Sequence, residues 1–390
     1  MSTALIPVSR PDVGHRELAA VQQILSTGWL GHGAAVIDFE AELSSLLGGR
    51  HVVAVSTGTA ALHLTLEALG VKPGDEVILP SFTFCSCPHV VTQLGAMPVF
   101  CDVSDQTLTM DISDVRRCLS RKTRAIMPVH FCGTVCDMTS LQEIGRDQEV
   151  AIVEDAAHAF GCSYKGALIG SFGDITCFSF DPIKNITCGE GGAIVLSDSE
   201  LAEKMARKRM MGIDRDGWKR CQEGWGYGYA VTTQGFRYHM SNINASIGLA
   251  QLSRFPELSK RRKKVALKYY AMLEDITAIR LPAWDLATVV PFAFMLRIKN
   301  GMRDELREYL LRAGVQTAVH YPPNHLQPAF AQYRRPLPVT EVAATEIMTI
   351  PLFPSMSDGE IEYVANEIRS FFGAMQLAAT EPVLNGEDCA

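Results

Sequence analysis

Short apolar runs of strand length alternate with helical patterns through the N-terminal part of this 390-residue chain. The strand-like runs lie at 51–55, 76–79, 98–101, 125–128 and 151–153. Helical spacing fills the stretches between them, for example at 140–146. Consecutive strands joined by helices pair in parallel, because a parallel pair needs a crossover connection. We therefore predict an α/β fold whose large domain is built on a mostly parallel mixed sheet.

The pattern changes near residue 256. A long helical stretch at 256–273 precedes a strand-like run at 292–298 and helices at 303–313 and 358–371. This mixture predicts a smaller C-terminal α+β domain. The last residues are small, polar and acidic, which is typical of a mobile tail. We expect a large domain over residues 1–255, which includes an N-terminal substrate loop, a small domain over 256–373 and a tail over 374–390.

Charge and hydropathy limit the partners of the chain. Its net charge of −7 argues against a broadly basic surface that would bind nucleic acid. One basic run, at 260–264, is either the solvated face of a helix or a contact to a substrate diphosphate. No stretch approaches the roughly 18 apolar residues of a membrane helix, and residues 1–10 lack a signal core. We expect a cytoplasmic protein with no membrane partner.

Cysteines and histidines show no metal-binding pattern. The 11 cysteines are scattered, and the pair Cys85 and Cys87 has the wrong spacing for zinc. We interpret the cysteines as small buried apolar residues in a reducing cytosol. The ten histidines are dispersed, and His63 and His130 are expected to be core or loop residues. We predict no metal site.

Three positions carry chemistry that a purely structural role would not need. Asp155 ends an apolar strand, where it is either a cofactor contact or the N-cap of an expected helix. Lys184 follows a strand in a turn with Gly and Pro, where it is either a solvated surface group or a desolvated amine that forms a Schiff base. Gly58 and Thr59 open a helix after another strand, which makes either a phosphate seat or a simple Thr cap.

Together these positions meet the requirements of pyridoxal 5′-phosphate (PLP). That cofactor needs a lysine for an imine, a carboxylate on its pyridinium nitrogen and an anchor for its phosphate. The carboxylate keeps the ring protonated, so that the ring can absorb carbanion charge. The sequence therefore predicts a PLP site that includes Lys184 and Asp155.

The same residues carry a family resemblance. Motifs occur in order at 58–61, 80–84, 154–158, 179–185, 189–192, 240–252 and 319–322. With them the chain resembles the DegT/DnrJ family of nucleotide-sugar aminotransferases. The resemblance implies fold type I of the PLP enzymes and a homodimer with composite active sites. It also implies amino transfer from glutamate to a nucleotide-linked keto-deoxysugar, with pyridoxamine 5′-phosphate as the intermediate.

The resemblance further implies roles for single residues. Lys184 would form the imine and shuttle the proton, and Asp155 would contact the pyridine nitrogen. His158 would contact the ring hydroxyl, and Phe84 would stack on the ring. The phosphate would be bound by Gly58, Thr59, Ala60 and Ser179. The sugar side would be lined by Trp29, Leu30, His320 and Tyr321, although Trp29 and Tyr321 equally suit core or interface packing.

Three positions depart from the family pattern. Arg237 stands where the family commonly has an Asn that reaches the phosphate of the partner subunit. An arginine there either binds that phosphate as a charge-assisted fork or points away. Asp181 replaces a frequent His and brings a carboxylate close to Lys184. Cys188 replaces a usual Thr.

The acceptor stays open among several classes. An unactivated keto-sugar acid or a keto-cyclitol is the alternative to a nucleotide-linked sugar. Relatives that act as sugar dehydratases carry His in place of the lysine, whereas Lys184 is intact here. A non-catalytic sensor on the same fold is a further alternative, against which the retained cofactor residues argue.

Overall fold

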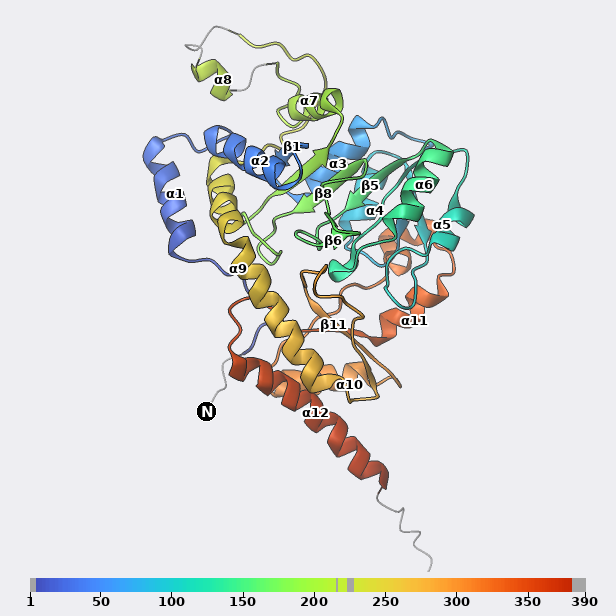
Figure 1. The fold of residues 1–390 in the computed structure, drawn as a ribbon. Helices are drawn as coiled ribbons and strands as arrows, with labels where there is room; N and C mark the ends of the chain where they lie inside the picture. Colours follow the sequence, from blue (N-terminus) through green and yellow to red (C-terminus); the bar gives the residue numbers. More distant parts are fainter. Residues whose placement is uncertain (1–4, 215–216, 223–227, 381–390) are drawn as a thin grey trace, which may run out of the picture.

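A seven-stranded sheet forms the centre of the structure, a computed structural model that describes residues 5–214, 217–222 and 228–380. In pairing order its strands are β1 (His51–Val55), β9 (Gly192–Leu196), β8 (Ile175–Ser179), β5 (Ala151–Asp155), β4 (Thr123–Ile126), β2 (Glu76–Pro80) and β3 (Met97–Cys101). Strand β9 is antiparallel to β1 and β8, and the other neighbouring pairs are parallel. The predicted mostly parallel mixed sheet is confirmed (Figure 1).

Helices cover both faces of this sheet. They are α1 (His15–Thr27), α2 (Ala34–Leu46), α3 (Gly58–Ala68), α4 (Ser86–Gln93), α5 (Ile112–Cys118), α6 (Met138–Gln148), α7 (Ser199–Lys208), α8 (Gly217–Gln222) and α9 (Asn242–Leu273), with the 3-10 turn η1 (Phe131–Gly133). Val53 and Val55 of β1 belong to the same apolar core as residues of α3 and α4, whereas Ala54 between them belongs to the core that contains residues of α2 and α9. This alternation follows from the two-residue period of a strand, and it explains why the strands are apolar on both faces.

A second, smaller sheet lies below the first in Figure 1. Its antiparallel strands are β10 (Ile279–Arg280), β11 (Phe294–Ile298) and β12 (Ile347–Ile350). Around it lie α10 (Arg303–Arg312), α11 (Pro338–Glu346) and α12 (Asp358–Thr380), whereas the 3-10 turns η2 (Asn324–Leu326) and η3 (Pro328–Tyr333) pack at the β2–β3 side of the large sheet. The pair β6 (Ser163–Tyr164) and β7 (Ala167–Leu168) forms a separate hairpin. Tyr269 and Phe294 belong to the apolar core of the smaller sheet.

Helix α9 joins the two sheets and differs from its prediction. The expected helix at 256–273 is the second half of a 32-residue helix that continues through Pro256. The first half packs on α1 and α2, and α9 also contacts α12 (Figure 1). A proline is tolerated inside the helix where its missing hydrogen bond and ring can be accommodated, so the pattern break at residue 256 does not mark a linker.

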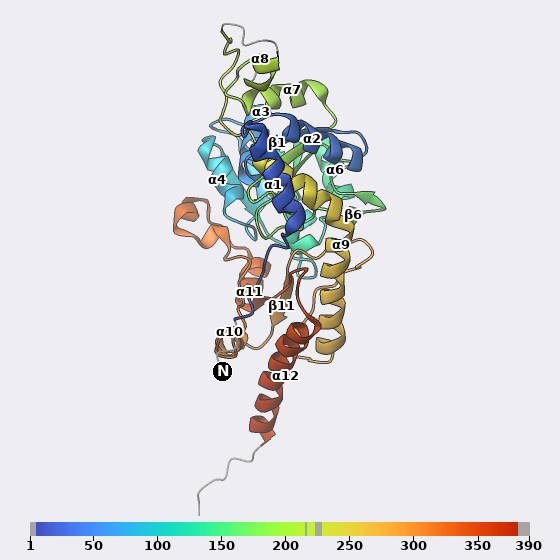
Figure 2. The same cartoon turned by 90° about the vertical axis from the view of Figure 1, so that its left-hand side faces the viewer.

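The chain ends also differ from the predicted division at residue 255. Ile6 forms an isolated bridge with Val315, and the backbone N–H of Leu352 donates to the carbonyl of Val8, so the N-terminal segment packs against the part of the chain that surrounds the smaller sheet. Helix α12 continues to Thr380, beyond the predicted start of the tail at 374, and extends away from both sheets (Figure 2). Residues 381–390 of the predicted tail lie outside the described residues.

No helix follows β5, contrary to the prediction. Residues 156–162 form turns that lead into the β6–β7 hairpin. The Asp155 carboxylate accepts from the backbone N–H of Ala157, and Gly161 has a left-handed φ of 82°. A side chain at Gly161 would also collide with the Phe255 ring, so close packing and turn chemistry replace helical spacing here.

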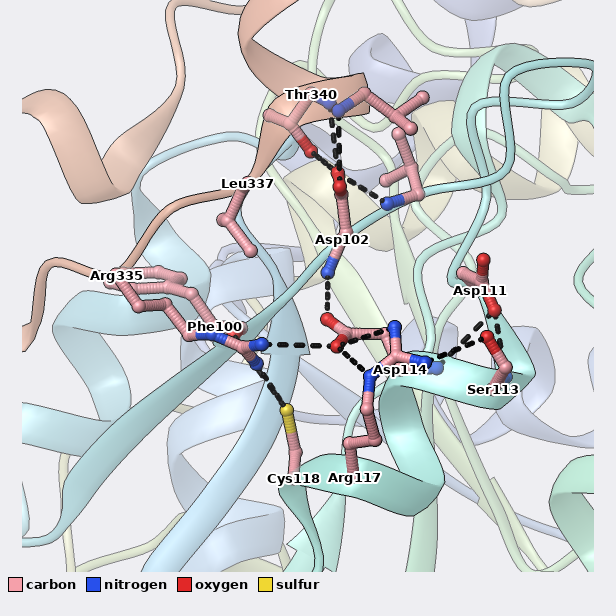
Figure 3. A network of polar contacts seen from close by, with 12 residues as sticks. Phe100, Asp102, Asp111, Ser113, Asp114, Arg117, Cys118, Arg335, Leu337 and Thr340 are labelled. Carbon is pink, nitrogen blue, oxygen red and sulfur yellow. Dashed lines mark hydrogen bonds and ion pairs between the residues drawn. The ribbon is translucent and has the colours of Figure 1, made fainter.

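A buried carboxylate network fastens α11 to the large sheet (Figure 3). Asp102, just after β3, accepts from the backbone N–H groups of Val339 and Thr340 and from the Thr340 hydroxyl, over 2.7–3.0 Å. The backbone N–H of Asp102 donates to Asp114, which also accepts from Arg335. Asp102 therefore caps the N-terminus of a helix that is distant in sequence.

Replacing Asp102 with alanine is expected to destabilise the protein by about 2 kcal/mol, because α11 loses its cap and a buried hydroxyl loses its acceptor. The midpoint of thermal unfolding, followed by circular dichroism, should fall by several degrees. Asp102→Asn is the control, because its amide oxygen keeps one acceptor and should lose less. A midpoint for Asp102→Ala equal to that of the unchanged protein would contradict this role.

Candidate active site

One cavity of about 300 Å³ lies at the carboxyl edge of the large sheet. Asp155 and Ser179 are the last residues of β5 and β8, and Gly58 opens α3 after β1. Because β1, β8 and β5 run in the same direction, their carboxyl ends meet at this edge. The cavity brings together nine of the predicted residues, namely Gly58, Thr59, Phe84, Asp155, His158, Ser179, Lys184, His320 and Tyr321.

Lys184 lies in the turn after β8. Its backbone N–H donates to the carbonyl of Asp181, whose carboxylate accepts from the N–H of Ile183 at 3.2 Å. The Lys184 Nζ lies 4.4 Å from the centre of the Phe292 ring. Burial lowers the pKa of this amine, and the charges of Asp181 and Asp155 only partly oppose that effect. A larger neutral fraction makes the amine a better nucleophile and base.

Asp155 is 6% exposed and keeps its carboxylate at the cavity wall. One oxygen accepts from the backbone N–H of Ala157 at 3.0 Å, and the other accepts from the thiol of Cys87 at 3.0 Å. Burial, followed by the charge of Asp155, raises the pKa of Cys87 well above its ordinary value. Cys87 therefore stays a thiol and remains a donor. The sequence analysis predicted Asp155 as a site residue but did not predict its contact with Cys87.

His158 is held by rings and a backbone donor. Its imidazole stacks on the Phe292 ring, with centres 4.0 Å apart and planes at 5°. The Nδ1 atom accepts from the backbone N–H of Cys132, so the proton of the neutral ring is on Nε2, 3.1 Å from the Tyr321 hydroxyl. Burial, followed by the charge of Lys184, lowers the pKa of His158 well below its usual range. His158 is neutral near pH 7.

His320 and Tyr321 complete this wall. Burial and the charge of Lys184 lower the pKa of His320 to about 4, and its Nδ1 lies 2.8 Å from the Thr349 hydroxyl. Burial raises the pKa of Tyr321 well above its usual value, so the phenol stays protonated. The ring of Phe84, which is 52% exposed, lies 5.7 Å from that of Tyr321.

A compact polar corner lies where α3 begins. A side chain at Gly58 would place its Cβ 2.8 Å from that of Ser179, so only glycine allows this close approach. Thr57 caps α3 by accepting from the backbone N–H of Ala60 at 3.0 Å. Ala60 consequently has no free N–H for a phosphate and does not line the cavity, whereas Gly58, Thr59 and Ser179 do. The cap and the candidate phosphate seat therefore coexist.

Three predicted residues lie away from this cavity. Arg237 is exposed and forms a β-bridge with Met210. Trp29 and Leu30 line a separate depression of about 290 Å³, where the Trp29 and Trp218 ring centres lie 5.3 Å apart. Within one chain, the substrate loop and the cavity are thus separate.

The basic run at 260–264 divides into two environments. Lys264 pairs with Asp358, and Arg261 pairs with Glu257, on the surface of α9. Arg262 is 3% exposed and points inward. None of the five lines the cavity. The solvated helix face predicted for the run describes Arg261 and Lys264 but not Arg262.

His63, His130 and most of the cysteines lie in the core. His130 is buried and its Nε2 lies 3.0 Å from Glu154, and His63 is buried 3.2 Å from the Tyr238 hydroxyl. Most cysteines in the described ranges are buried, and each of them is free. Among the described residues, no group of three or more His, Cys, Asp or Glu side chains could hold a metal. Within the same part of the chain, no helix is long and apolar enough to cross a membrane.

The donor set fits PLP on the observations above. A desolvated amine and a buried carboxylate face one cavity. At the Gly58 corner a side chain would collide with Ser179, so glycine keeps this place open for a bound group. The cavity volume falls at the lower end of the range for small-molecule sites, about 300–1,000 Å³.

Comparison with known proteins agrees with this interpretation. Residues 11–369 match the family described as "DegT/DnrJ/EryC1/StrS aminotransferase family". The aminotransferase TlmJ from Streptoalloteichus hindustanus is 35% identical, with a TM-score of 0.89 over 95% of this chain and 100% of that chain. DesV from S. venezuelae is 33% identical, with a TM-score of 0.87 over 95% and 99%.

A third similar structure carries the cofactor forms in its description. The putative sugar aminotransferase Spr1654 from Streptococcus pneumoniae has been solved in a PLP form, at 30% identity and a TM-score of 0.88 over 95% of this chain and 99% of that chain. It has also been solved in a PMP form, with a TM-score of 0.89. The predicted fold type I architecture is confirmed by these matches over nearly the whole chain.

Proposed function

The chain belongs to the DegT/DnrJ/EryC1/StrS aminotransferase family, and from that premise we propose that it is a PLP-dependent enzyme that transfers an amino group from glutamate to a nucleotide-linked keto-deoxysugar. The observation that carries the proposal is the meeting of Lys184, Asp155 and the Gly58 corner at one cavity. When bound, PLP supplies an aldehyde for covalent attachment and a ring that accepts electrons as a proton leaves the amino-bearing carbon.

Lys184 has two tasks in this scheme. Its Nζ would bind the aldehyde carbon and would be released when the amino group of glutamate takes its place. The freed amine would then take the proton from the substrate carbon and hold it at Nζ for its return. Its lowered pKa suits both tasks, because only the neutral amine attacks a carbonyl or accepts a proton.

Asp155 and the aromatic wall orient the ring. The Asp155 carboxylate would accept from the ring N–H and hold that proton in place. The Cys87 thiol and the Ala157 backbone fix the carboxylate from behind. Neutral His158 would face the ring hydroxyl, and Phe84 would cover one face of the ring.

In this proposal, different residues bind the phosphate and the sugar. Gly58, Thr59 and Ser179 would hold the phosphate at the start of α3, where helix N–H groups favour an anion. His320 and Tyr321 would face the sugar. In a homodimer, Arg237 would reach the phosphate of the partner subunit, and Trp29 and Leu30 would border its sugar site. The free cysteines suit the reducing cytoplasm.

The proposal is tested by two half-reactions of the purified protein loaded with PLP. Glutamate alone should convert the bound cofactor to its pyridoxamine form and release one equivalent of 2-oxoglutarate. The pyridoxamine form should then be discharged by one member of a panel of nucleotide-linked 3-keto and 4-keto deoxysugars, with the amino sugar identified by mass spectrometry.

Each half-reaction has an outcome that contradicts it. Discharge only by an unactivated keto-sugar acid or a keto-cyclitol would overturn the nucleotide-linked acceptor. Conversion by another amino acid but not by glutamate would overturn the donor. A protein that binds PLP but discharges no acceptor and consumes no donor would be a sensor rather than an enzyme.

A further inference from the structure

Arg262 spans two chain segments that are distant in sequence. Its guanidinium is buried beneath the active site. Among the described residues, it donates hydrogen bonds only to backbone carbonyls. The Nη1 atom donates to the carbonyls of Pro291 and Phe292, at 3.4 and 3.0 Å. The Nη2 atom donates to the carbonyls of Ile183 and Lys184, at 3.4 and 3.1 Å. One planar group thus fixes the spacing between the Lys184 turn and the segment before β11.

The side chains of the two segments meet at the amine. Lys184 Nζ lies over the Phe292 ring, and the same ring is stacked with the imidazole of His158. A cation over an aromatic face is attracted to the ring, whereas a neutral amine packs there by contact alone. Arg262 therefore holds the backbone of Lys184 and the backbone of the residue on which its amine rests.

We propose that Arg262 is a positioning residue for Lys184, which sets the distance and direction of the amine through the backbone of Lys184 and the ring of Phe292. The proposal rests on the proposed function, because it assigns Arg262 to the same amine. Lysine has a flexible stem, so the placement of its Nζ depends on the backbone and on the surface against which it packs. Catalytic groups need placement of this kind, since an error of about 1 Å can cost about 10²-fold in rate.

Electrostatics support this placement. Arg262 is a positive charge close to Lys184, and it contributes to the lowered pKa of the amine, although burial contributes more. Asp181, Asp155 and Cys132 act in the opposite direction. A guanidinium that is shared among carbonyls keeps its positive field, because no carboxylate neutralises it by direct contact among the described residues.

The test compares Arg262→Met, Arg262→Lys and Phe292→Leu with Arg303→Met. Arg303 is a matched control, because its guanidinium also donates to two carbonyls, those of Ala344 and Ile347. These contacts lie beside the smaller sheet, away from the cavity. Five quantities are measured: the unfolding midpoint without cofactor, the labelling rate of Lys184 by an amine-reactive reagent without cofactor, the affinity for PLP, and kcat and KM for glutamate.

We expect Arg262→Met to lower kcat about 10–100-fold, with KM changed less than about threefold and a changed labelling rate of Lys184. The kcat of Arg262→Lys should lie between that of Arg262→Met and that of the unchanged protein, because an ammonium group lacks the planar fork that reaches both segments. Phe292→Leu should change the labelling rate and kcat with the Arg262 carbonyl contacts intact. Arg303→Met should lower the midpoint and leave kcat unchanged.

The proposal is overturned if Arg262→Met, or Phe292→Leu where the methionine variant fails to fold, keeps the labelling rate and kcat of the unchanged protein. It is also overturned if Arg303→Met lowers kcat as much as Arg262→Met does, because the effect would then follow stability alone. An unchanged protein that forms no covalent bond with PLP would refute the proposed function instead, so the two failures are distinct.

Discussion

Lys184→Ala is expected to abolish amino transfer, with kcat lower by about 10²–10⁴-fold. The variant loses both the amine that binds the cofactor aldehyde and the base that moves the proton. It keeps the cavity wall, because Asp181 fixes the turn through backbone atoms. The fold should therefore survive, and the visible absorbance band of the lysine-bound cofactor should be absent.

The measurement is a single-turnover reaction with glutamate, followed by absorbance. Lys184→Arg preserves the positive charge and should be as inactive as the alanine variant, since a guanidinium neither attacks an aldehyde nor accepts a proton near pH 7. Lys299→Ala removes an exposed lysine that follows strand β11 of the smaller sheet, and it should leave the rate unchanged. Persistent turnover by Lys184→Ala at the original rate would refute the role of this residue.

Asp155→Asn carries the second large effect, a loss in kcat of about 10²–10³-fold, which is the size seen when one electrostatic contact to a transition state is removed. The amide preserves the size of the side chain and can still accept from the Ala157 N–H. It cannot hold a proton on the pyridine nitrogen as a carboxylate does. The ring then loses much of its capacity to take up negative charge.

The pH-dependent absorbance spectrum of the bound cofactor provides the measurement for Asp155. Asp155→Asn should still bind PLP through Lys184 but should convert slowly with glutamate. Asp285→Asn is the matched control, because Asp285 is exposed in a turn far along the chain from this carboxylate. An Asp155→Asn variant with the unchanged rate would show that no carboxylate is needed on the ring.

Local signals sufficed for the centre of the site. Asp155 ends an apolar strand and Lys184 follows one, and the parallel direction of the strands places such ends at one edge of the sheet. Gly58 was predicted because it opens a helix after a strand, where free backbone N–H groups can seat a phosphate. In each case the strand or turn and its chemistry lie within a few residues of one another.

Residues that act through distant contacts were missed. Arg262 belongs to a run of five basic residues, and its sequence neighbours are surface groups, so the run gave no sign that one member is buried. Phe292 was assigned to a strand of the smaller domain, yet its ring contacts His158 and Lys184, which line the cavity. Cys87 was interpreted as a buried apolar residue, and its thiol contact to Asp155 depends on how α4 meets β5.

One expectation failed for a local reason. The helix expected after β5 is replaced by turns, because the Asp155 carboxylate bonds its own backbone neighbour and Gly161 takes a conformation that suits a turn. Ala60 was expected among the phosphate-binding residues, and in the structure the Thr57 hydroxyl accepts its backbone N–H. Periodicity alone does not show which side chains satisfy nearby backbone groups.

The covalent link between Lys184 and the cofactor is the central claim, and borohydride reduction of the PLP-loaded protein tests it most directly. Reduction fixes the cofactor to whichever amine holds it, and peptide mapping by mass spectrometry then locates the adduct. The account predicts a single adduct on the peptide that contains Lys184. An adduct on a different lysine, or none in a protein that has bound PLP, would contradict it.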